Sequence, residues 1–100
     1  MADTDVVLKK DVKDKFKEPP RYKVLLMNDN VTTMDFVVAL LMTVFRHSEA
    51  SAVDLTMQIH NEGSAVAGIY THEIAEQKVL DATSMARNNG FPLVIKAEQE

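Results

Sequence analysis

The order of apolar and polar residues along the chain predicts three strands. Residues 22–27 are rich in strand-forming side chains, and they stop at residues 28–30, Asn-Asp-Asn, which favour a turn through side-chain bonds to the backbone. Residues 64–70 have a similar strand-forming composition. Residues 91–95 form a last apolar segment before a charged C-terminus, and they predict the third strand.

Helical spacing follows the first turn. Thr32 or Thr33 can cap a helix that has Asp35 in its first turn. The apolar residues of this helix recur every three or four positions, at Met34, Val37, Val38, Leu41 and Phe45, and Leu40 and Val44 widen the apolar stripe. We therefore expect this helix to be deeply buried.

A second helix is predicted after a connector at residues 47–49. It contains the apolar residues Val53, Met57 and Ile59 and ends at His60. Gly63 suits the left-handed position that commonly ends a helix. Two helices therefore separate the first two strands.

The third predicted helix begins at Thr71 and ends at residues 88–90, Asn-Asn-Gly. One face of it carries Ala75, Val79, Ala82 and Ala86. The element order is therefore β-α-α-β-α-β. This order predicts an α+β fold in which a small three-stranded antiparallel sheet packs against three helices that cover one face.

Residues 1–20 differ in composition from the rest of the chain. They alternate charges, contain few large apolar residues and close on Pro19-Pro20, so they bury too little surface to offset the entropy of ordering. We expect residues 1–20 to form a disordered tail and residues 21–100 to form one domain. A short helix over residues 6–16 would need a partner, because its apolar positions are sparse.

The composition excludes several classes of protein. A chain of 100 residues closes a single core, and a formal net charge of -4 with interspersed signs is not that of a nucleic-acid binder. The absence of cysteine excludes disulfides, thiolate nucleophiles and cysteine-rich zinc sites. The longest apolar run, residues 36–42, is far shorter than the roughly 20 residues that span a bilayer. Since no signal-like segment opens the chain, we expect a cytoplasmic protein that binds neither nucleic acid nor membrane.

The polar residues have ordinary structural explanations when each is taken alone. Residues 28–30 suit a turn, and a calcium loop is excluded because the glycine and glutamate of that motif are missing. His60 suits a helix end, and we expect His47 and His72, at element boundaries, to be exposed to solvent. No serine has a nucleophile motif, and one His with one Asp far apart in sequence defines no catalytic pair. We expect no catalysis, no metal and no cofactor.

Taken together, the sequence resembles the ClpS family. Residues 22–37, Tyr-Lys-Val-Leu-Leu-Met-Asn-Asp-Asn-Val-Thr-Thr-Met-Asp-Phe-Val, match the opening of that family. The match continues, in order and at family spacing, through Ile59-His60, Gly63, Gly68-Ile69-Tyr70-Thr71, residues 73–79 and Pro92-Leu93. The resemblance therefore spans Tyr22 to Ile95, and it implies the same α+β fold.

The resemblance implies an adaptor and not an enzyme. ClpS proteins bind N-degrons, which are proteins whose exposed first residue is bulky and apolar, and deliver them to a ClpA or ClpC unfoldase for degradation. By resemblance, Asn28, Asp29 and His60 hold the free α-amino group of the substrate. The first side chain then enters an apolar pocket near Thr32, Met34, Val37, Ile59 and Leu93.

The chemistry of the three polar residues suits a cation. An α-amino group has a pKa of about 8, so it is mostly charged at neutral pH, and burying it unpaired costs several kcal/mol. Asp29 supplies the opposing charge, and the Asn28 carbonyl and a neutral His60 ring can each accept one proton. An acetylated or internal residue offers no such cation and should be rejected.

By resemblance, Met34 matches a family methionine that disfavours β-branched first residues of the substrate. Its presence therefore favours Leu, Phe, Tyr and Trp as first residues. Two other positions depart from the family. Asn30 stands where a second acidic residue is common, so the turn carries less negative charge. Thr56 stands where a methionine is common, one helical turn before His60. Thr56 either lines the pocket or only packs in the core. If it lines the pocket, the order in which the pocket prefers Leu, Phe, Tyr, Trp, Ile and Val as first residues cannot be carried over from the family.

The resemblance also implies a partner surface. Glu73, Glu76 and Lys78 match the family's contact surface for the N-terminal domain of the unfoldase, although such charges are often simply solvated. By resemblance the tail would engage the unfoldase during handover. Two alternatives are a module of similar fold that docks on a translation or ribosomal-stalk partner and ignores N-termini, and a hydrolase that uses His60 and Asp29. Only the adaptor explains the three polar residues within so long a match.

Overall fold

The computed structural model describes residues 19–100. Of the predicted tail it describes only Pro19 and Pro20, which are exposed and have no regular structure, so the division between tail and domain stays a prediction. The short helix considered over residues 6–16 lies outside the described residues. In residues 19–100, no helix is both long enough and apolar enough to cross a membrane.

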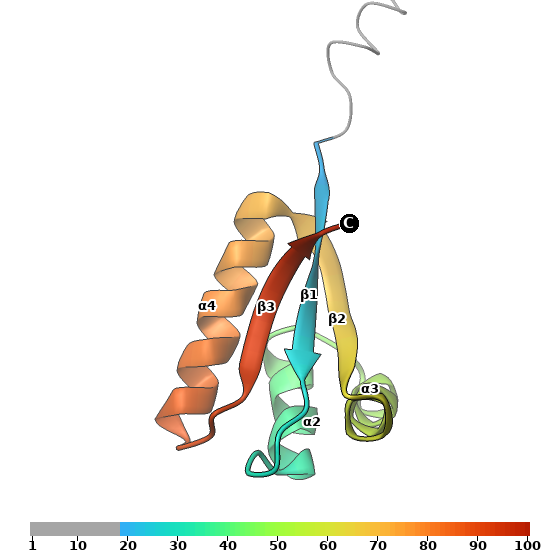
Figure 1. Ribbon diagram of the computed structural model, residues 1–100, viewed down its shortest axis with the longest axis vertical. Helices are drawn as coiled ribbons and strands as arrows, with labels where there is room; N and C mark the ends of the chain where they lie inside the picture. The colour runs from blue at the N-terminus through green and yellow to red at the C-terminus, as the bar shows by residue number, and fades with distance from the viewer. Residues whose placement is uncertain (1–18) are drawn as a thin grey trace, which may run out of the picture.

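Six elements follow one another in the predicted order. They are β1 (Arg21–Met27), α2 (Met34–Thr43), α3 (Glu49–Glu62), β2 (Ser64–Thr71), α4 (His72–Asn88) and β3 (Val94–Gln99) (Figure 1). The strands pair antiparallel in the order β2-β1-β3, so β1 is the central strand. The α+β fold expected from the sequence is thus confirmed.

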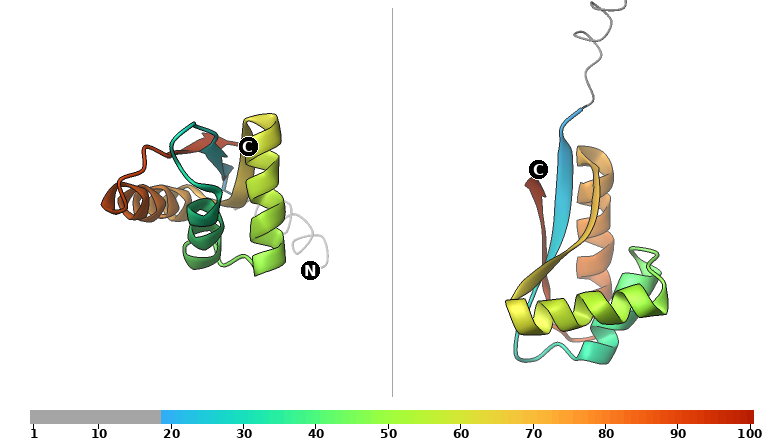
Figure 2. Two further views of the ribbon diagram at one scale, coloured as in Figure 1. Left: turned by 90° about the horizontal axis from the view of Figure 1, so that it is seen from below. Right: turned by 90° about the vertical axis from the view of Figure 1, so that its right-hand side faces the viewer.

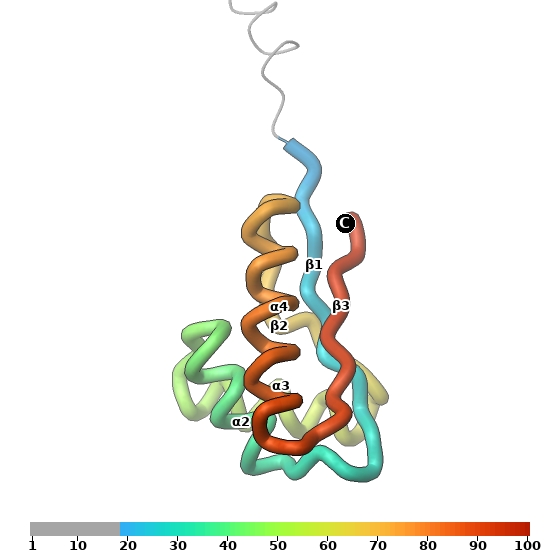
Figure 3. Tube along the Cα trace, turned by 90° about the vertical axis from the view of Figure 1, so that its left-hand side faces the viewer, coloured from blue at the N-terminus to red at the C-terminus, as the bar shows by residue number. Residues whose placement is uncertain are grey.

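The helices lie in two groups. α4 runs along one face of the sheet, beside β1 and β3 (Figure 3). α2 and α3 lie at the end of the sheet where β1 ends and β2 begins, and α3 crosses that end (Figure 2). This end of the sheet therefore gathers the exit turn of β1, the start of α2 and the last turn of α3.

The core fills the space between the sheet and the helices. Val24 and Leu26 of the central strand are fully buried, and α2 contributes Val37, Leu40 and Leu41. The inner face of α4 is built from small residues, Ala75, Ala82 and Ala86, as its sequence pattern predicts. Small side chains let a helix approach a sheet closely, so α4 gives the sheet a rigid backing.

α3 is the helix whose packing differs most from its sequence pattern. Val53 and Met57, two of the apolar residues that located this helix in the sequence, are 42% and 43% exposed. The buried residues are Ala52, Thr56 and Ile59. These three recur at helical spacing and pack toward α2 and β2, because α3 crosses the end of the sheet with that face inward.

The last strand begins later than residues 91–95 predict. The Phe91 N–H donates to the carbonyl of Ala86 at 2.9 Å, so Phe91 closes the end of α4. Pro92 has no N–H to donate to a sheet ladder. The ladder therefore starts at Val94, opposite Met27, and continues along β1 into the charged C-terminal residues.

His47 is half-buried, which corrects the prediction that it is exposed to solvent. A bulge between the pairs of Val24 and Leu25 leaves Ala67 of β2 out of the ladder. The His47 Nε2–H donates to the Ala67 carbonyl at 2.6 Å, and Nδ1 lies 3.0 Å from the Ser51 hydroxyl. His47 therefore ties the connector between α2 and α3 to the bulge, whereas His72 is exposed as predicted.

Candidate functional site

The end of β1 and the end of α3 meet through a single backbone contact. The Asn28 N–H donates to the carbonyl of Gly63 at 2.9 Å. Gly63 has a φ of 93°, which glycine adopts without steric cost, and this conformation ends α3 and turns the chain into β2. Asn28 is therefore held beside the last turn of α3, which carries His60.

The turn after β1 is organised by the carboxylate of Asp29. Oδ1 accepts the Val31 N–H at 2.8 Å and the Thr32 N–H at 2.7 Å, and Oδ2 accepts the Thr32 hydroxyl at 2.8 Å. Thr33 is then the residue that caps α2, accepting the Phe36 N–H at 3.2 Å. One carboxylate thus fixes the whole turn between β1 and α2.

The same contacts keep Asp29 ionised. Partial burial would raise the pKa of this carboxyl, but the Thr32 N–H, the Thr32 hydroxyl and the Val31 N–H all stabilise the charged form. The positive charge of Arg87 adds to their effect. The pKa of Asp29 therefore lies below its ordinary value, and the turn presents a negative charge at neutral pH.

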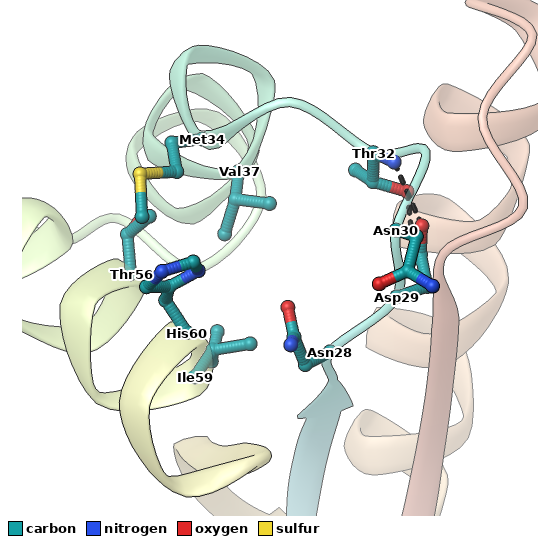
Figure 4. Close-up of a pocket in the computed structure, with 9 residues that line it drawn as sticks. All are labelled: Asn28, Asp29, Asn30, Thr32, Met34, Val37, Thr56, Ile59 and His60. Atoms are coloured by element: carbon teal, nitrogen blue, oxygen red, sulfur yellow. Dashed lines mark hydrogen bonds between the residues drawn. The ribbon is translucent and has the colours of Figure 1, made fainter.

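A pocket of about 280 Å³ opens between this turn and the two helices (Figure 4). Its lining residues are Asn28, Asp29, Asn30, Thr32, Met34, Val37, Thr56, Ile59 and His60. The turn supplies a polar side, and α2 and α3 supply a mostly apolar side that faces it (Figure 4). Pockets for drug-sized ligands start at about 300 Å³, so this one suits a single amino-acid residue.

The structure brings together all but one of the residues predicted to bind substrate. Leu93 does not line the pocket. It is 1% exposed and lies in the core just before β3. Asn30 does line the pocket, although the sequence marked it only as a departure from the family. Its place between Asp29 and Thr32 in the turn was the signal that could have identified it.

Thr56 both packs in the core and lines the pocket, so the two roles considered for it from the sequence are compatible. Its side chain is buried, and its hydroxyl donates to the Ala52 carbonyl at 2.7 Å. The hydroxyl proton is thus engaged inside α3, which leaves Thr56 no donor for a ligand. Its contribution to the pocket is its small volume.

Asn28 and His60 differ from Asp29 because their side chains have no hydrogen-bond partner within residues 19–100. Among residues 19–100, neither side chain makes a hydrogen bond, and both residues are exposed. Figure 4 shows the Asn28 amide projecting between the turn and α3, with His60 on the α3 side. An amide oxygen and an imidazole nitrogen near a carboxylate can together accept protons from a small cation.

The residues predicted to contact an unfoldase lie on the first turns of α4, at the opposite end of the sheet from the pocket (Figure 1). Glu73 and Glu76 are exposed, and Glu76 pairs with His72 at 3.1 Å. Lys78 is half-buried, and its amine donates to the Val44 carbonyl at 2.7 Å. Because Val44 caps α2, Lys78 joins α4 to the negative end of that helix.

An α+β domain whose pocket sets a carboxylate, an amide and an imidazole beside an apolar wall has the features of a binding module for a small ligand that is both cationic and apolar. The family model described as ATP-dependent Clp protease adaptor protein ClpS matches residues 17–96, and the chain belongs to this family.

Individual relatives agree with this assignment. The chain is 46% identical to the ATP-dependent Clp protease adapter protein ClpS of Myxococcus xanthus. The two sequences align over 98 residues, which is 98% of this chain and 92% of that protein. It is 49% identical over 84 residues to the protein of the same description from Desulfotalea psychrophila, covering 84% and 82%. These relatives are described as adaptors and not as enzymes.

A solved structure shows the same fold. The structure of Agrobacterium tumefaciens ClpS2 bound to L-phenylalaninamide is similar to this chain with a TM-score of 0.81 and 41% sequence identity, over 83% of this chain and all of that one. The ligand of that neighbour carries a free amine and an aromatic side chain, and its carboxyl end is an amide.

Proposed function

We propose that this ClpS-family adaptor binds N-degrons through their free α-amino group and bulky apolar first residue, and that it delivers them to a Clp protease. The observation that carries the proposal is the pocket itself, in which unpartnered Asn28 and His60 side chains stand beside the ionised Asp29 and an apolar wall. The phenylalaninamide bound by the similar ClpS2 has both groups that such a pocket requires.

The amine would be held by two free acceptors and one charge. The Asn28 carbonyl and a His60 ring nitrogen each accept one proton of the ammonium group. Asp29 already accepts three hydrogen bonds from the turn, so it acts mainly through its charge and the remaining lone pair on Oδ2. Without such partners, burial of the cation would cost several kcal/mol.

The first side chain would enter the apolar side of the pocket. Val37 and Ile59 are buried there at 5% and 4% exposure, and Met34, at 39%, stands at the start of α2. Thr56 lies on the same side of the pocket as Met34, and its side chain is small. We propose Leu, Phe, Tyr and Trp as accepted first residues, with their order set by this wall.

The partner surface would be the exposed start of α4. Glu73 and Glu76 lie at the far end of the sheet from the pocket, so an adaptor could hold its substrate and its partner together. Lys78 belongs to this surface by resemblance, although its amine is committed to Val44. The partner would be the N-terminal domain of a ClpA- or ClpC-type unfoldase. A cytoplasmic location stays a prediction.

The test is the affinity for a labelled peptide that begins with Phe, measured by fluorescence anisotropy with a free and with an acetylated N-terminus. Acetylation removes the cation, and the loss of a buried charge pair costs about 2–5 kcal/mol, so affinity should fall at least about thirtyfold. Equal binding of both peptides would contradict the proposal and favour a module that ignores N-termini. Cleavage of the free peptide would instead indicate a hydrolase.

The partner surface has its own test. The double variant Glu73→Lys with Glu76→Lys should lose binding to a ClpA or ClpC N-terminal domain while it keeps full affinity for the Phe peptide. Asp81→Lys, a single charge reversal farther along α4, is the control. Retained unfoldase binding in the double variant would show that the partner docks elsewhere.

A further inference from the structure

The connector between α2 and α3, residues 44–48, is tied to two elements that are distant in the sequence. The Lys78 amine of α4 donates to the Val44 carbonyl at 2.7 Å, across 34 residues. The His47 Nε2–H donates to the carbonyl of Ala67, in the bulge of β2, at 2.6 Å, across 20 residues. The connector is therefore held from outside the helix pair that it joins.

The ring of His47 is held in one orientation. A carbonyl oxygen only accepts, so in the neutral ring Nε2 carries the proton, and Nδ1 accepts from the Ser51 hydroxyl 3.0 Å away. Ser51 belongs to the first turn of α3. The backbone N–H of His47 also donates to the Leu41 carbonyl of α2 at 3.1 Å. His47 thus joins α2, α3 and β2 at one point.

The amine of Lys78 is held in place from two sides. Besides its bond to the Val44 carbonyl, it lies 5.8 Å from the centre of the Tyr70 ring of β2. Val44 caps α2, so its carbonyl belongs to the negative end of that helix, where a cation is favoured. Lys78 therefore fixes the end of α2 against α4 and β2.

The conformation of the connector requires such contacts. Arg46 has a φ of 61°, a left-handed conformation that is uncommon for a residue with a side chain. It persists where the surroundings hold it. The bonds of Lys78 to Val44 and of His47 to Ala67 hold the chain on either side of Arg46.

The connector lies at the opposite end of α2 from the pocket. Met34 and Val37, at the start of α2, line the pocket, and Thr56 and Ile59 of α3 line it beside them. Figure 2 shows α2 and α3 side by side. A helix of 10 residues is about 15 Å long, so a rotation of about 5° at the connector moves the start of α2 by about 1 Å.

We propose that His47 and Lys78 are positioning residues for the choice of the first residue: by fixing the connector, they set the spacing of α2 and α3 and the size of side chain that the pocket accepts. This step rests on the proposed function. Neither residue lines the pocket, so both act through the two helices. When either bond is lost, the wall can spread, so a Trp side chain gains room and a Leu side chain loses contacts.

The test measures the affinities of two peptides that differ only in beginning with Trp or Leu, by fluorescence anisotropy and without an unfoldase. In Lys78→Met and in His47→Leu, the affinity for the Trp peptide relative to the Leu peptide should rise about three- to fivefold over wild type. A merely destabilised fold would weaken both peptides by the same factor, because it lowers only the folded fraction. The ratio therefore separates positioning from stability.

Conservative variants should restore the wild-type ratio. Lys78→Arg keeps a cationic donor for the Val44 carbonyl, and His47→Gln keeps an N–H for the Ala67 carbonyl. Lys96→Met, which removes an exposed lysine that pairs with Glu98 on β3, is the control and should keep the ratio.

Ser51→Ala is a milder variant that keeps the test valid even if the other two fail to fold. It removes the Nδ1 partner of His47 and should raise the ratio about twofold. A ratio that stays at or below the wild-type value in the folded variants would overturn the positioning role alone. Failure of the wild-type protein to bind either peptide would overturn the proposed function and the positioning role with it.

Discussion

The two sides of the pocket hold their polar groups in different ways. On the turn side, the carboxylate of Asp29 is bonded to Val31 and Thr32, so the group that supplies charge also holds the turn in shape. On the helix side, His60 extends from the last turn of α3, and its side chain makes no hydrogen bond within residues 19–100. Substitution of Asp29 should therefore affect stability and binding together, whereas substitution of the free acceptors Asn28 and His60 should affect binding alone.

The largest effect is expected from Asp29→Ala. The change removes the charge opposite the amine and the acceptor of three turn hydrogen bonds, so affinity for a Phe peptide should fall at least about a hundredfold. The free energy of unfolding, measured with urea, should fall by about 1 kcal/mol. Asp35→Ala removes an acidic residue in the first turn of α2 that does not line the pocket, and as the control it should leave the affinity unchanged.

Loss of a free acceptor should have a smaller effect that is confined to binding. His60→Ala or Asn28→Ala removes one hydrogen bond to a charged amine, which is worth about 1.5 kcal/mol or roughly tenfold in affinity. Calorimetric melting should show stability within about 0.5 kcal/mol of wild type, because neither side chain bonds to the fold. His72→Ala controls for general loss of histidine. A large drop in melting temperature would contradict the distinction between the two sides.

Substitutions of Thr56 test the apolar wall that α2 and α3 contribute to the pocket. Thr56→Met adds volume to the wall, so the affinity for a Trp peptide relative to a Leu peptide should fall by about fivefold. Thr56→Val keeps the shape, and its relative affinities should stay near wild type. An unchanged Trp-to-Leu ratio in the methionine variant would mean that Thr56 only packs.

The smallest effect concerns acid pH. Because the pKa of Asp29 is lower in the folded protein than in the unfolded chain, its ionised form stabilises the fold at pH above the unfolded value. This stabilisation is lost as the pH falls through the folded value. Urea titrations should show Asp29→Asn less stable than wild type by about 0.5 kcal/mol at pH 7, and this difference should shrink as the pH falls toward 2. A constant difference at both pH values would contradict the role of the charge.

Much of the fold could be predicted because most elements carry their own periodicity. The alanine face of α4 and the turn at residues 28–30 are local patterns. α3 was recognised, but its buried face was not, because Ala52 and Thr56 carry a weaker apolar signal than the exposed Val53 and Met57. The start of β3 was misplaced because an apolar run does not reveal that Phe91 closes α4.

The site could be predicted only in part, because some of its contacts join residues that are far apart in the sequence. Asn28, Asp29 and His60 were named from their resemblance to a family pattern, and the structure places all three on one pocket. Leu93 was misplaced because its position depends on how Arg87 holds the segment before β3. The partner of His47 is a bulge carbonyl of β2, twenty residues away, and no local pattern encodes it. The roles of the site residues stay predictions.

The most direct measurement is the crystal structure of this protein with a peptide that begins with Phe. The account predicts that the α-amino nitrogen lies within about 3 Å of the Asn28 amide oxygen and a His60 ring nitrogen. The Asp29 carboxylate should still accept its bonds from Val31 and Thr32, and the Phe ring should lie against Val37 and Ile59. A bound peptide whose amine lies away from both Asn28 and His60 would contradict the account.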